Sequence, residues 1–423
     1  MSSILISGAY CILPEGEEKR ADIYIENGRI SVVSDNIRKS ADRYINGENL
    51  VAMPALFDMH VHFRDPGFTY KEDIFTGSES AIAGGFSGVA CMPNTKPVCD
   101  NADVLSYIFD RSASADFKVY PIACTTRGMQ GNEICDYGAL KKCGAVAVSD
   151  DGRPVENDEI MEKALVSAYN NAVPIISHCE DLNIIDGGII NKGAISEKLG
   201  VKGMDRASEN NITEREILLA EKTNTAIHIA HVSTKESVDL VRKAKQRGVK
   251  VTCETCPHYF CLTDELLVLR DADYRMNPPL REEEDRLAII EGLSDGTIDC
   301  IVTDHAPHSA NDKADFFKAP NGIVGLETSL AATLTELYHK NNFSLSDICN
   351  LMSQNPRRIL NLPLCELKAN SCADIVLFDL NERWRIELNK LKSKSKNTAF
   401  KHMIFTGKPV MTIIDGKIRY ENI

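Results

Sequence analysis

Residues 50–62 read LVAMPALFDMHVH, an almost unbroken apolar run that ends in two histidines separated by one residue. A near-continuous apolar run is typical of a strand that is buried on both faces, as strands are in a parallel sheet. Because side chains alternate along a strand, His60 and His62 are expected to point to the same face. The sequence therefore predicts a buried parallel strand that carries two imidazoles at its carboxyl end.

Seven further apolar runs recur along the chain, and helix-like segments lie between most of them. Such alternation of buried strands with helices predicts an α/β fold, and with eight strands the sheet is expected to close into a (β/α)8 TIM barrel. The further strands are expected at residues 87–92, 118–124, 145–149, 173–177, 226–230, 249–255 and 298–303. Helices are expected at 74–83, 102–111, 158–170, 213–223, 234–247, 282–293, 327–340 and 345–354.

The two ends of the chain differ from this central pattern. Residues 1–50 and 366–423 contain short alternating runs, and Asn27-Gly28 and Asp415-Gly416 are typical of tight hairpin turns. Neither end is long enough to bury a core alone. Both ends are therefore expected to pair into one small β-sandwich domain beside the barrel, which would occupy residues 51–365.

Composition argues against several classes of function. The 423 residues carry a formal net charge of −13, and an acidic surface repels phosphate backbones, so nucleic-acid binding is not expected. No run of about 18 apolar residues predicts a membrane span, and no secretory signal is expected at the N-terminus. The 14 cysteines are scattered, which is typical of reduced thiols in a cytoplasmic protein.

Histidines and acids stand at the carboxyl ends of five predicted strands. In a (β/α)8 barrel these ends meet at one rim, which is where active sites lie. Several imidazoles and carboxylates that converge from distant strands are what a transition metal requires. The residues are His60 and His62, Asp150-Asp151, His178, His231 and Asp304.

Other polar residues near these strand ends need separate interpretation. Adjacent strand residues face opposite ways, so only one of Asp150 and Asp151 is expected to be a ligand, and a bulge in the register would exchange the two. His305 is expected to be structural because its neighbour Asp304 uses the inward direction. His228 precedes His231 by three residues, so it is expected to face the other side and to pack against a helix.

Four motifs together resemble a known family. They are DMHVHFRDPG at 58–67, MPNT at 92–95, TDHAPH at 303–308 and GIVGLET at 322–328. Their sequence and order are similar to those of the amidohydrolase superfamily and, within it, of the dihydroorotase family of the long bacterial type. The resemblance covers nearly the whole chain.

The resemblance implies a barrel with a centre of one or two Zn2+ ions per chain. Many cyclic amidohydrolases bridge two zincs with a carboxylated lysine on strand four, but Lys141 and Lys142 precede that strand here. The chain resembles instead the branch that uses an aspartate, which leaves the occupancy of the second metal open. By motif match, His60 and His62 would bind the first metal, His178 and His231 the second, Asp151 would be a ligand, and Asp304 would bind the first metal and act as general base and acid.

The resemblance also implies a substrate and partners. The reaction would be the reversible interconversion of (S)-dihydroorotate and N-carbamoyl-L-aspartate in de novo pyrimidine biosynthesis. By motif match, Arg64, Asn94 and His308 would hold the substrate carboxylate and Asn277 the ring. A homodimer and an association with aspartate transcarbamoylase are further expectations.

The chemistry agrees with these residue types. Zinc lowers the pKa of a bound water from 15.7 to about 7, and an ionised carboxylate such as Asp304 can move the proton to the departing nitrogen. The alternatives are another cyclic amidohydrolase (allantoinase, hydantoinase or dihydropyrimidinase) and a scaffold protein without metal. A guanidinium fork at Arg64 favours a substrate that bears an acid.

Two polar segments are expected to be loops. Residues 309–321 form a long connection after the eighth strand, and such loops often act as lids over a site. The Lys-rich run 390–396 is expected to be a solvated loop or helix face.

Overall fold

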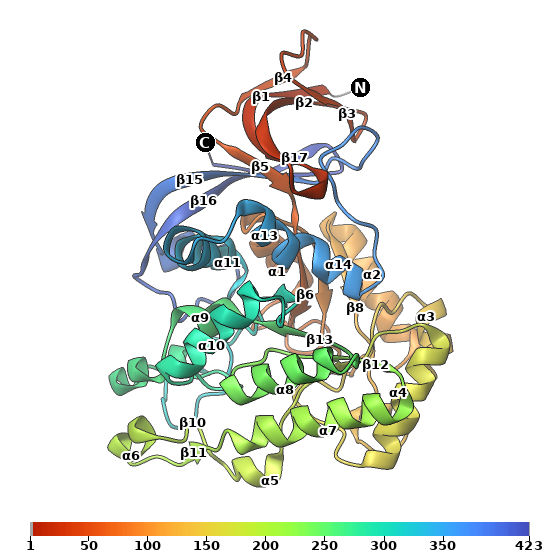
Figure 1. Cartoon of the computed structure of the whole chain (residues 1–423), viewed down its shortest axis with the longest axis vertical. Helices are drawn as coiled ribbons and strands as arrows, with labels where there is room; N and C mark the ends of the chain where they lie inside the picture. The colour runs from red at the N-terminus through yellow and green to blue at the C-terminus, as the bar shows by residue number, and fades with distance from the viewer. Residues whose placement is uncertain (1–2, 423) are drawn as a thin grey trace.

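The computed structural model describes residues 3–422, and it joins both ends of the chain in one curved sheet (Figure 1). The strands are β1 (Ser3–Ile12), β2 (Glu18–Glu26), β3 (Arg29–Ser34), β4 (Arg43–Asn46), β5 (Val51–Pro54), β15 (Ile375–Arg385), β16 (Ile404–Ile414) and β17 (Lys417–Glu421). Their order is β17-β16-β15-β5-β1-β2-β3, and β4 pairs with β1. Strands from the two termini thus meet where β5 pairs with β15.

The two predicted hairpin turns are confirmed. Asn27 and Gly28 join β2 to β3 with φ angles of 52° and 79°. Asp415 and Gly416 join β16 to β17 with φ angles of 49° and 71°. Two successive residues with positive φ make the type I′ turn, whose twist matches that of the flanking strands.

A second set of strands is parallel and forms a barrel. These strands are β6 (Leu56–Val61), β7 (Phe86–Cys91), β8 (Lys118–Pro121), β9 (Ile176–Ser177), β12 (Ala226–Ile229), β13 (Lys250–Thr255) and β14 (Cys300–Ile301). The fourth position is a short extended segment whose Val148 bridges to Ala123 on one side and Ile175 on the other. A bridge between Val61 and His305 closes the ring. The predicted class, a (β/α)8 TIM barrel with a small β-sandwich, is confirmed.

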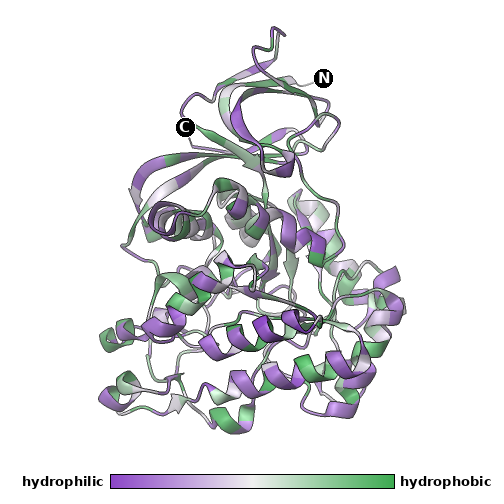
Figure 2. Cartoon of the chain, viewed as in Figure 1, coloured by the Kyte–Doolittle hydropathy of each residue, from purple (hydrophilic) through white to green (hydrophobic). Residues whose placement is uncertain are grey.

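Helices cover the outside of the barrel, and hydrophilic residues lie along much of the visible surface of the two helices α7 (Ala207–Thr223) and α8 (Lys235–Gln246) (Figure 2). The others are α1 (Ile74–Ala83), α2 (Ala102–Ala115), α3 (Tyr137–Lys142), α4 (Asp158–Asn171), α5 (Leu182–Ile185), α6 (Ala194–Leu199), α9 (Pro257–Cys261), α10 (Glu283–Ser294), α11 (Leu326–Thr333), α12 (His339–Asn341), α13 (Leu345–Cys349) and α14 (Asn355–Ile359). No helix within residues 3–422 has the length and apolar character needed to cross a membrane.

Shorter elements interrupt or connect these helices. Where single helices were predicted after the eighth strand, π-helical turns at Leu334–Tyr338 and Asn350–Gln354 link α11 to α12 and α13 to α14. Short 3-10 helices lie at Pro14–Gly16, Arg127–Met129, Asp264–Leu269, Ala272–Tyr274 and Leu388–Lys390. Two small strands, β10 (Ile190–Asn191) and β11 (Gly203–Met204), pair with each other in the connection that follows β9.

Strand β15 connects the two parts of the fold through its alternating side chains. Val376 and Phe378 are buried in the apolar cluster that also contains barrel residues. Ile375 and Leu377 are buried in the cluster of the terminal sheet. Because a strand turns successive side chains to opposite faces, one strand contributes to both cores.

Replacement of Phe378 by alanine tests this shared role. We expect Phe378→Ala to lower the free energy of unfolding by about 3–5 kcal/mol, since the side chain is fully buried and would leave a cavity. Urea denaturation followed by fluorescence and circular dichroism should show one shifted transition. The exposed Arg383 on the same strand gives the control, because Arg383→Ala should change stability by less than about 0.5 kcal/mol.

Candidate metal centre

Side chains from five strand ends meet around the carboxylate of Asp151. Its oxygens lie 3.4 Å from His60 Nε2, 3.5 Å from His62 Nε2, 3.4 Å from His178 Nδ1 and 3.7 Å from His231 Nε2. All of these side chains are buried. The structure therefore brings the four predicted imidazoles to one carboxylate at the mouth of the barrel.

Asp304 joins the cluster on the side of the first histidine pair. Its Oδ1 lies 3.1 Å from His62 Nε2 and 3.7 Å from His60 Nε2. The backbone of Asp304 is left-handed, with φ 47°, and so is that of His231, with φ 32°. Such conformations cost non-glycine residues of order 1–3 kcal/mol each, and they occur where a site demands a particular direction of the side chain.

A break in strand β6 turns the two histidines of the His-x-His pair inward. Phe57 and Met59 belong to the cluster inside the barrel, whereas Val61 belongs to the cluster outside it. The pairing of β6 with β7 shifts register between Asp58 and Val61. A bulge of this kind re-aims side chains, so His60 and His62 can face the barrel interior as Phe57 and Met59 do.

The structure distinguishes the two adjacent aspartates after the fourth strand. Asp150 Oδ1 accepts hydrogen bonds from the backbone N–H groups of Thr125 at 2.9 Å and Thr126 at 3.1 Å. Its carboxylate therefore ties a neighbouring loop, and burial raises its pKa to about 6. Asp151, and not Asp150, lies among the imidazoles.

The expectation for His228 is wrong. Its ring does not pack against a helix, because Nε2 lies 3.1 Å from Glu254 Oε2 and Nδ1 lies 2.8 Å from Thr252 Oγ1. His228 and Ala230 alternate on the inner face of β12 and its extension, and the left-handed backbone of His231 then turns that side chain inward as well. A regular strand cannot place residues three apart on one face, but this interrupted one does.

Outer partners fix the orientation of three imidazoles. His60 Nδ1 lies 2.5 Å from Glu254 Oε1, His62 Nδ1 lies 2.9 Å from Asn94 Oδ1, and His178 Nε2 lies 3.0 Å from Glu180 Oε2. Each of these oxygens accepts a hydrogen bond, so the named ring nitrogen carries the proton. The other nitrogen of each ring then directs its lone pair at the centre of the cluster, as metal-binding histidines do.

The arrangement fits divalent cations. His60 Nε2 and Asp151 Oδ1 are buried without a hydrogen-bond partner, and His178 Nδ1 lies 2.9 Å from His231 Nε2. Lone pairs and negative charge at this separation require a positive charge between them. Two potential ligand groups share Asp151, namely His60, His62 and Asp151, and Asp151, His178 and His231.

Comparison with known proteins places the chain in a family. A family profile described as "Dihydro-orotase-like" matches residues 49–237. The chain is 45% identical over 418 residues to a dihydroorotase of Acetivibrio thermocellus, with 98% of each chain covered. It is 46% identical over 423 residues to one of Geobacter metallireducens, covering 99% of this chain and 100% of the relative. The chain belongs to the dihydroorotase family.

Solved structures support the fold of this dihydroorotase family member. An L-hydantoinase (dihydropyrimidinase) from Arthrobacter aurescens superposes with a TM-score of 0.87 at 25% identity, covering 100% of this chain and 97% of that one. A dihydropyrimidinase from Brevibacillus agri gives a TM-score of 0.85 at 19% identity, with 99% and 95% covered. The latter likeness shows the fold alone.

The predicted substrate-binding residues differ in their contacts: two bond to groups around the metal ligands, and two contact each other. Arg64 has a left-handed backbone, and its Nη2 lies 3.4 Å from His308 Nε2. Asn94 donates from Nδ2 to the backbone oxygen of Asp151 at 3.3 Å, besides its contact with His62. Asn277 Nδ2 donates to Glu180 Oε1 at 2.9 Å. Two of the four therefore also position groups around the metal ligands.

Sequence reasoning missed Glu254 and Glu180, which hold the imidazoles of His60 and His178. A signal for Glu254 exists, because it is the one acid in the apolar run 249–255 and a buried carboxylate needs a partner. Glu180 stands two residues after His178 but outside any strand, so periodicity does not identify it.

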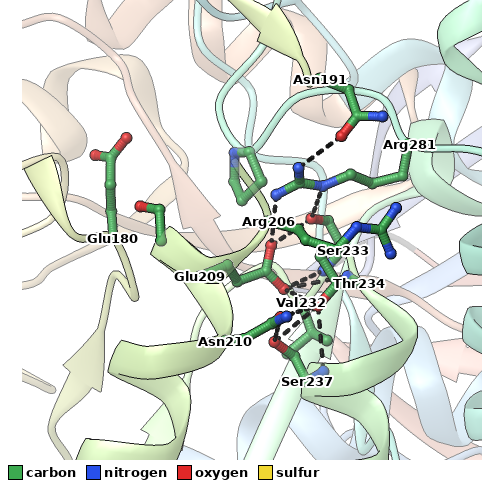
Figure 3. A network of polar contacts seen from close by, with 12 residues as sticks. Glu180, Asn191, Arg206, Glu209, Asn210, Val232, Ser233, Thr234, Ser237 and Arg281 are labelled. Atoms are coloured by element: carbon green, nitrogen blue, oxygen red, sulfur yellow. Dashed lines mark hydrogen bonds and ion pairs between the residues drawn. The ribbon is translucent and has the colours of Figure 1, made fainter. Parts of the chain in front are cut away.

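A buried ion pair holds the loops around His231 and Asn277 (Figure 3). Glu209 of α7 accepts from the backbone N–H groups of Ser233 at 2.9 Å and Thr234 at 3.1 Å, just after His231. Arg281, which follows Asn277 by four residues, donates to Glu209 at 3.2 Å and to Ser233 Oγ at 3.0 Å. The pair thus connects the loop after the sixth strand with the loop after the seventh.

The long loop 309–321 is anchored by a buried lysine. Lys313 Nζ donates to the backbone oxygens of Arg275 at 3.2 Å, Pro320 at 3.0 Å and Gly322 at 3.0 Å. Phe316 of this loop is buried as well. The loop is therefore packed onto the barrel mouth; whether it moves as a lid stays a prediction.

The expectation of a solvated loop at 390–396 is wrong for its serines. Ser393 and Ser395 are buried, and Ser395 Oγ donates to the backbone oxygen of Lys71 at 2.6 Å. The backbone N–H of Lys394 donates to Glu72 Oε1 at 3.0 Å. The segment thus supports the loop that follows β6, and Lys394 Nζ donates to the backbone oxygen of Thr69 in that loop at 2.7 Å.

Lys313 gives the stability a pH dependence. Burial lowers its pKa to about 8, against about 10.4 in an unfolded chain, so between these values the unfolded state holds a proton that the folded state has lost. The free energy of unfolding should therefore rise with pH in this window, by at most about 3 kcal/mol, relative to that of Lys313→Met.

Urea denaturation of both proteins between pH 7.5 and 10.5 measures this difference. Lys318→Met is the control, since Lys318 belongs to the same loop but its side chain is 85% exposed. A difference between wild type and Lys313→Met that stays flat or falls with pH would contradict the assignment.

Glu254 should govern metal affinity through His60. We expect Glu254→Gln to weaken binding of Zn2+ at the His60 side about 10–100-fold, because outer partners of ligands typically contribute this much. Competition with a chromophoric chelator measures the affinity, and circular dichroism confirms folding. Glu387→Gln, at an exposed position, should bind metal like wild type, and an unchanged affinity in Glu254→Gln would refute the role of this contact.

Proposed function

We propose that the protein is a zinc-dependent cyclic amide hydrolase that interconverts (S)-dihydroorotate and N-carbamoyl-L-aspartate in pyrimidine biosynthesis. The observation that carries the proposal is the cluster of four inward-facing imidazoles around Asp151, in a chain 45% identical to a dihydroorotase over nearly its full length. Imidazole and carboxylate donors suit zinc. Because two ligand groups share Asp151, we propose two ions per chain.

The proposed roles follow from position. Five residues would hold zinc, namely His60, His62, His178, His231 and Asp151, and zinc would supply a Lewis acid that lowers the pKa of water to about 7. Asp304 lies beside the cluster, with its Oδ1 3.1 Å from His62 Nε2. Its carboxylate takes the proton of the attacking water and delivers it to the ring nitrogen as the amide bond breaks. The same groups act in reverse order when the ring closes.

The aspartate at strand four distinguishes this site from the alternatives. Within the described chain, the lysines nearest in sequence before Asp151 are Lys141 and Lys142 of α3, and Lys141 Nζ instead donates to the backbone oxygen of Asn171 at 2.7 Å. A site built on a bridging modified lysine is therefore not favoured. Arg64 near the cluster favours a substrate that bears a carboxylate, which hydantoin and dihydrouracil rings lack.

The proposal also covers the domain division, the cellular location and the partners of the protein. We propose a division into sandwich residues 1–50 and 366–423 and barrel residues 51–365, with β5 (Val51–Pro54) as the connecting strand that pairs within the terminal sheet. A cytoplasmic location is supported by the absence of disulfides among the 14 cysteines of the described chain. A homodimer and an association with aspartate transcarbamoylase, whose product would be the substrate for ring closure, rest on the family resemblance.

An assay of ring opening and ring closure on purified protein tests the function. Dihydroorotate should be hydrolysed and N-carbamoyl-L-aspartate cyclised by the same sample, with two zinc ions per chain by mass spectrometry of metals. Removal of metal by a chelator should abolish both directions, and added Zn2+ should restore them. Activity that survives complete removal of metal would contradict the proposal.

Asp304→Ala separates proton transfer from metal binding. We expect the turnover rate to fall about 10²–10⁴-fold, because a general base and acid contributes this much, while metal content stays near that of wild type. Steady-state kinetics and metal analysis on one sample measure both. Asp110→Ala, on the exposed face of α2, is the control and should retain full activity. A rate within tenfold of wild type for Asp304→Ala would exclude the assigned role.

A further inference from the structure

Both ring nitrogens of His308 are already engaged by the protein. Nε2 lies 2.9 Å from the backbone oxygen of Asn321, which can only accept, so this nitrogen carries the proton. Nδ1 lies 3.1 Å from Lys71 Nζ and therefore accepts from the ammonium group. Burial, with the charges of Arg64 and Lys71, lowers the pKa of His308 to about 2, so the ring stays neutral. In this arrangement the Nε2–H group of His308 points at a backbone oxygen, and its Nδ1 orients the ammonium group of Lys71.

Lys71 has donors to spare. An ammonium group has three N–H donors. One of them reaches His308, and the nearest carboxylate oxygen, on Asp312, lies 3.8 Å away, beyond hydrogen-bond distance. The side chain is only 16% exposed. Its backbone is fixed on both sides, because its N–H donates to Phe68 and its carbonyl accepts from Ser395 Oγ.

Within residues 3–422, Lys71 and Arg64 form a pair of cations without a hydrogen-bonded carboxylate, and the carboxylate nearest to Lys71 is that of Asp312, at 3.8 Å. Both contact the ring of His308, Arg64 from Nη2 at 3.4 Å and Lys71 at 3.1 Å. After burial, the charge of Arg64 is the main factor that lowers the pKa of Lys71, which is repulsion between the two. Among the described residues, neither cation has a carboxylate within hydrogen-bond distance. Buried charges are normally paired, so this gap matches a bound anion.

We propose that Lys71 is a specificity-determining residue that binds the substrate carboxylate together with Arg64. His308 then acts as a neutral support that positions the ammonium group. This inference rests on the proposed function, because it assigns the ligand to the ring carboxylate of that reaction. It also explains why the loop after β6 is fastened by the buried serines of 390–396.

Lys71→Met tests the proposal with a ring acid that the enzyme would bind but not hydrolyse. We expect the Kd for orotate, measured by calorimetry, and the KM for dihydroorotate to rise about 10–100-fold, since charged hydrogen bonds contribute that much. The turnover number should stay within about threefold. Uracil, which lacks the carboxylate, should bind equally to wild type and variant, whereas general damage to the site would weaken both ligands.

Matched variants complete the experiment. Lys71→Arg keeps the charge and should restore most of the affinity. Lys394→Met removes another lysine of the same region, whose Nζ donates to the backbone oxygen of Thr69 at 2.7 Å and does not contact His308; it should behave like wild type. His308→Leu should weaken orotate binding in wild type but add little to Lys71→Met, because His308 acts through Lys71.

The outcomes are separable. Unchanged orotate affinity and KM in Lys71→Met overturn the inference, and so does an additive loss in the double variant. If wild type does not turn over dihydroorotate, the proposed function fails, and the comparison of orotate with uracil still decides whether Lys71 binds a ring carboxylate.

Discussion

The cluster of imidazoles and carboxylates at the mouth of the barrel needs a positive charge at its centre. Four imidazoles and two carboxylates present lone pairs and negative charge to one another at 2.9–3.7 Å, out of contact with solvent. Without a cation such a cluster would be strongly unfavourable, because buried carboxylates need a compensating charge. Glu254, Asn94 and Glu180 hold the ring N–H groups away from the centre, since each accepts a hydrogen bond from an imidazole. The outer contacts therefore decide what the centre can hold.

The fold supplies this geometry through departures from regular strands. A register shift in β6 aims His60 and His62 together, and left-handed backbones aim His231 and Asp304. Asp58 connects two of these places, since its carboxylate accepts from the backbone N–H groups of His60 and Thr303, both at 3.0 Å. The cost of the strained backbone is offset by such contacts and by the packed interior layers below the site.

The sequence predicted what depends on periodicity and failed where periodicity is broken. The buried runs, the strand-end histidines and the two hairpin turns follow local patterns, so they could be read directly. His228 could not, because the left-handed backbone at His231 is not encoded by alternation. The buried Ser393 and Ser395 lie among lysines, and polar composition gives no sign that a backbone is covered. Lys71 and His308 meet across 237 positions, a contact that only the folded chain shows.

Selectivity for a substrate that bears a carboxylate depends on more than one cation of the site. A guanidinium at Arg64 alone does not make a selective anion site, since it already donates from Nε to the backbone oxygen of Pro307 at 3.3 Å. Lys71, a second cation at a fixed place, makes the site selective for anions. Two positive charges that repel each other in the empty site are stabilised most when an anion enters between them. The neutral state of His308 matters for this, since a third positive charge would raise the cost of the free site. Selectivity for a ring acid would thus come from repulsion that only a carboxylate relieves.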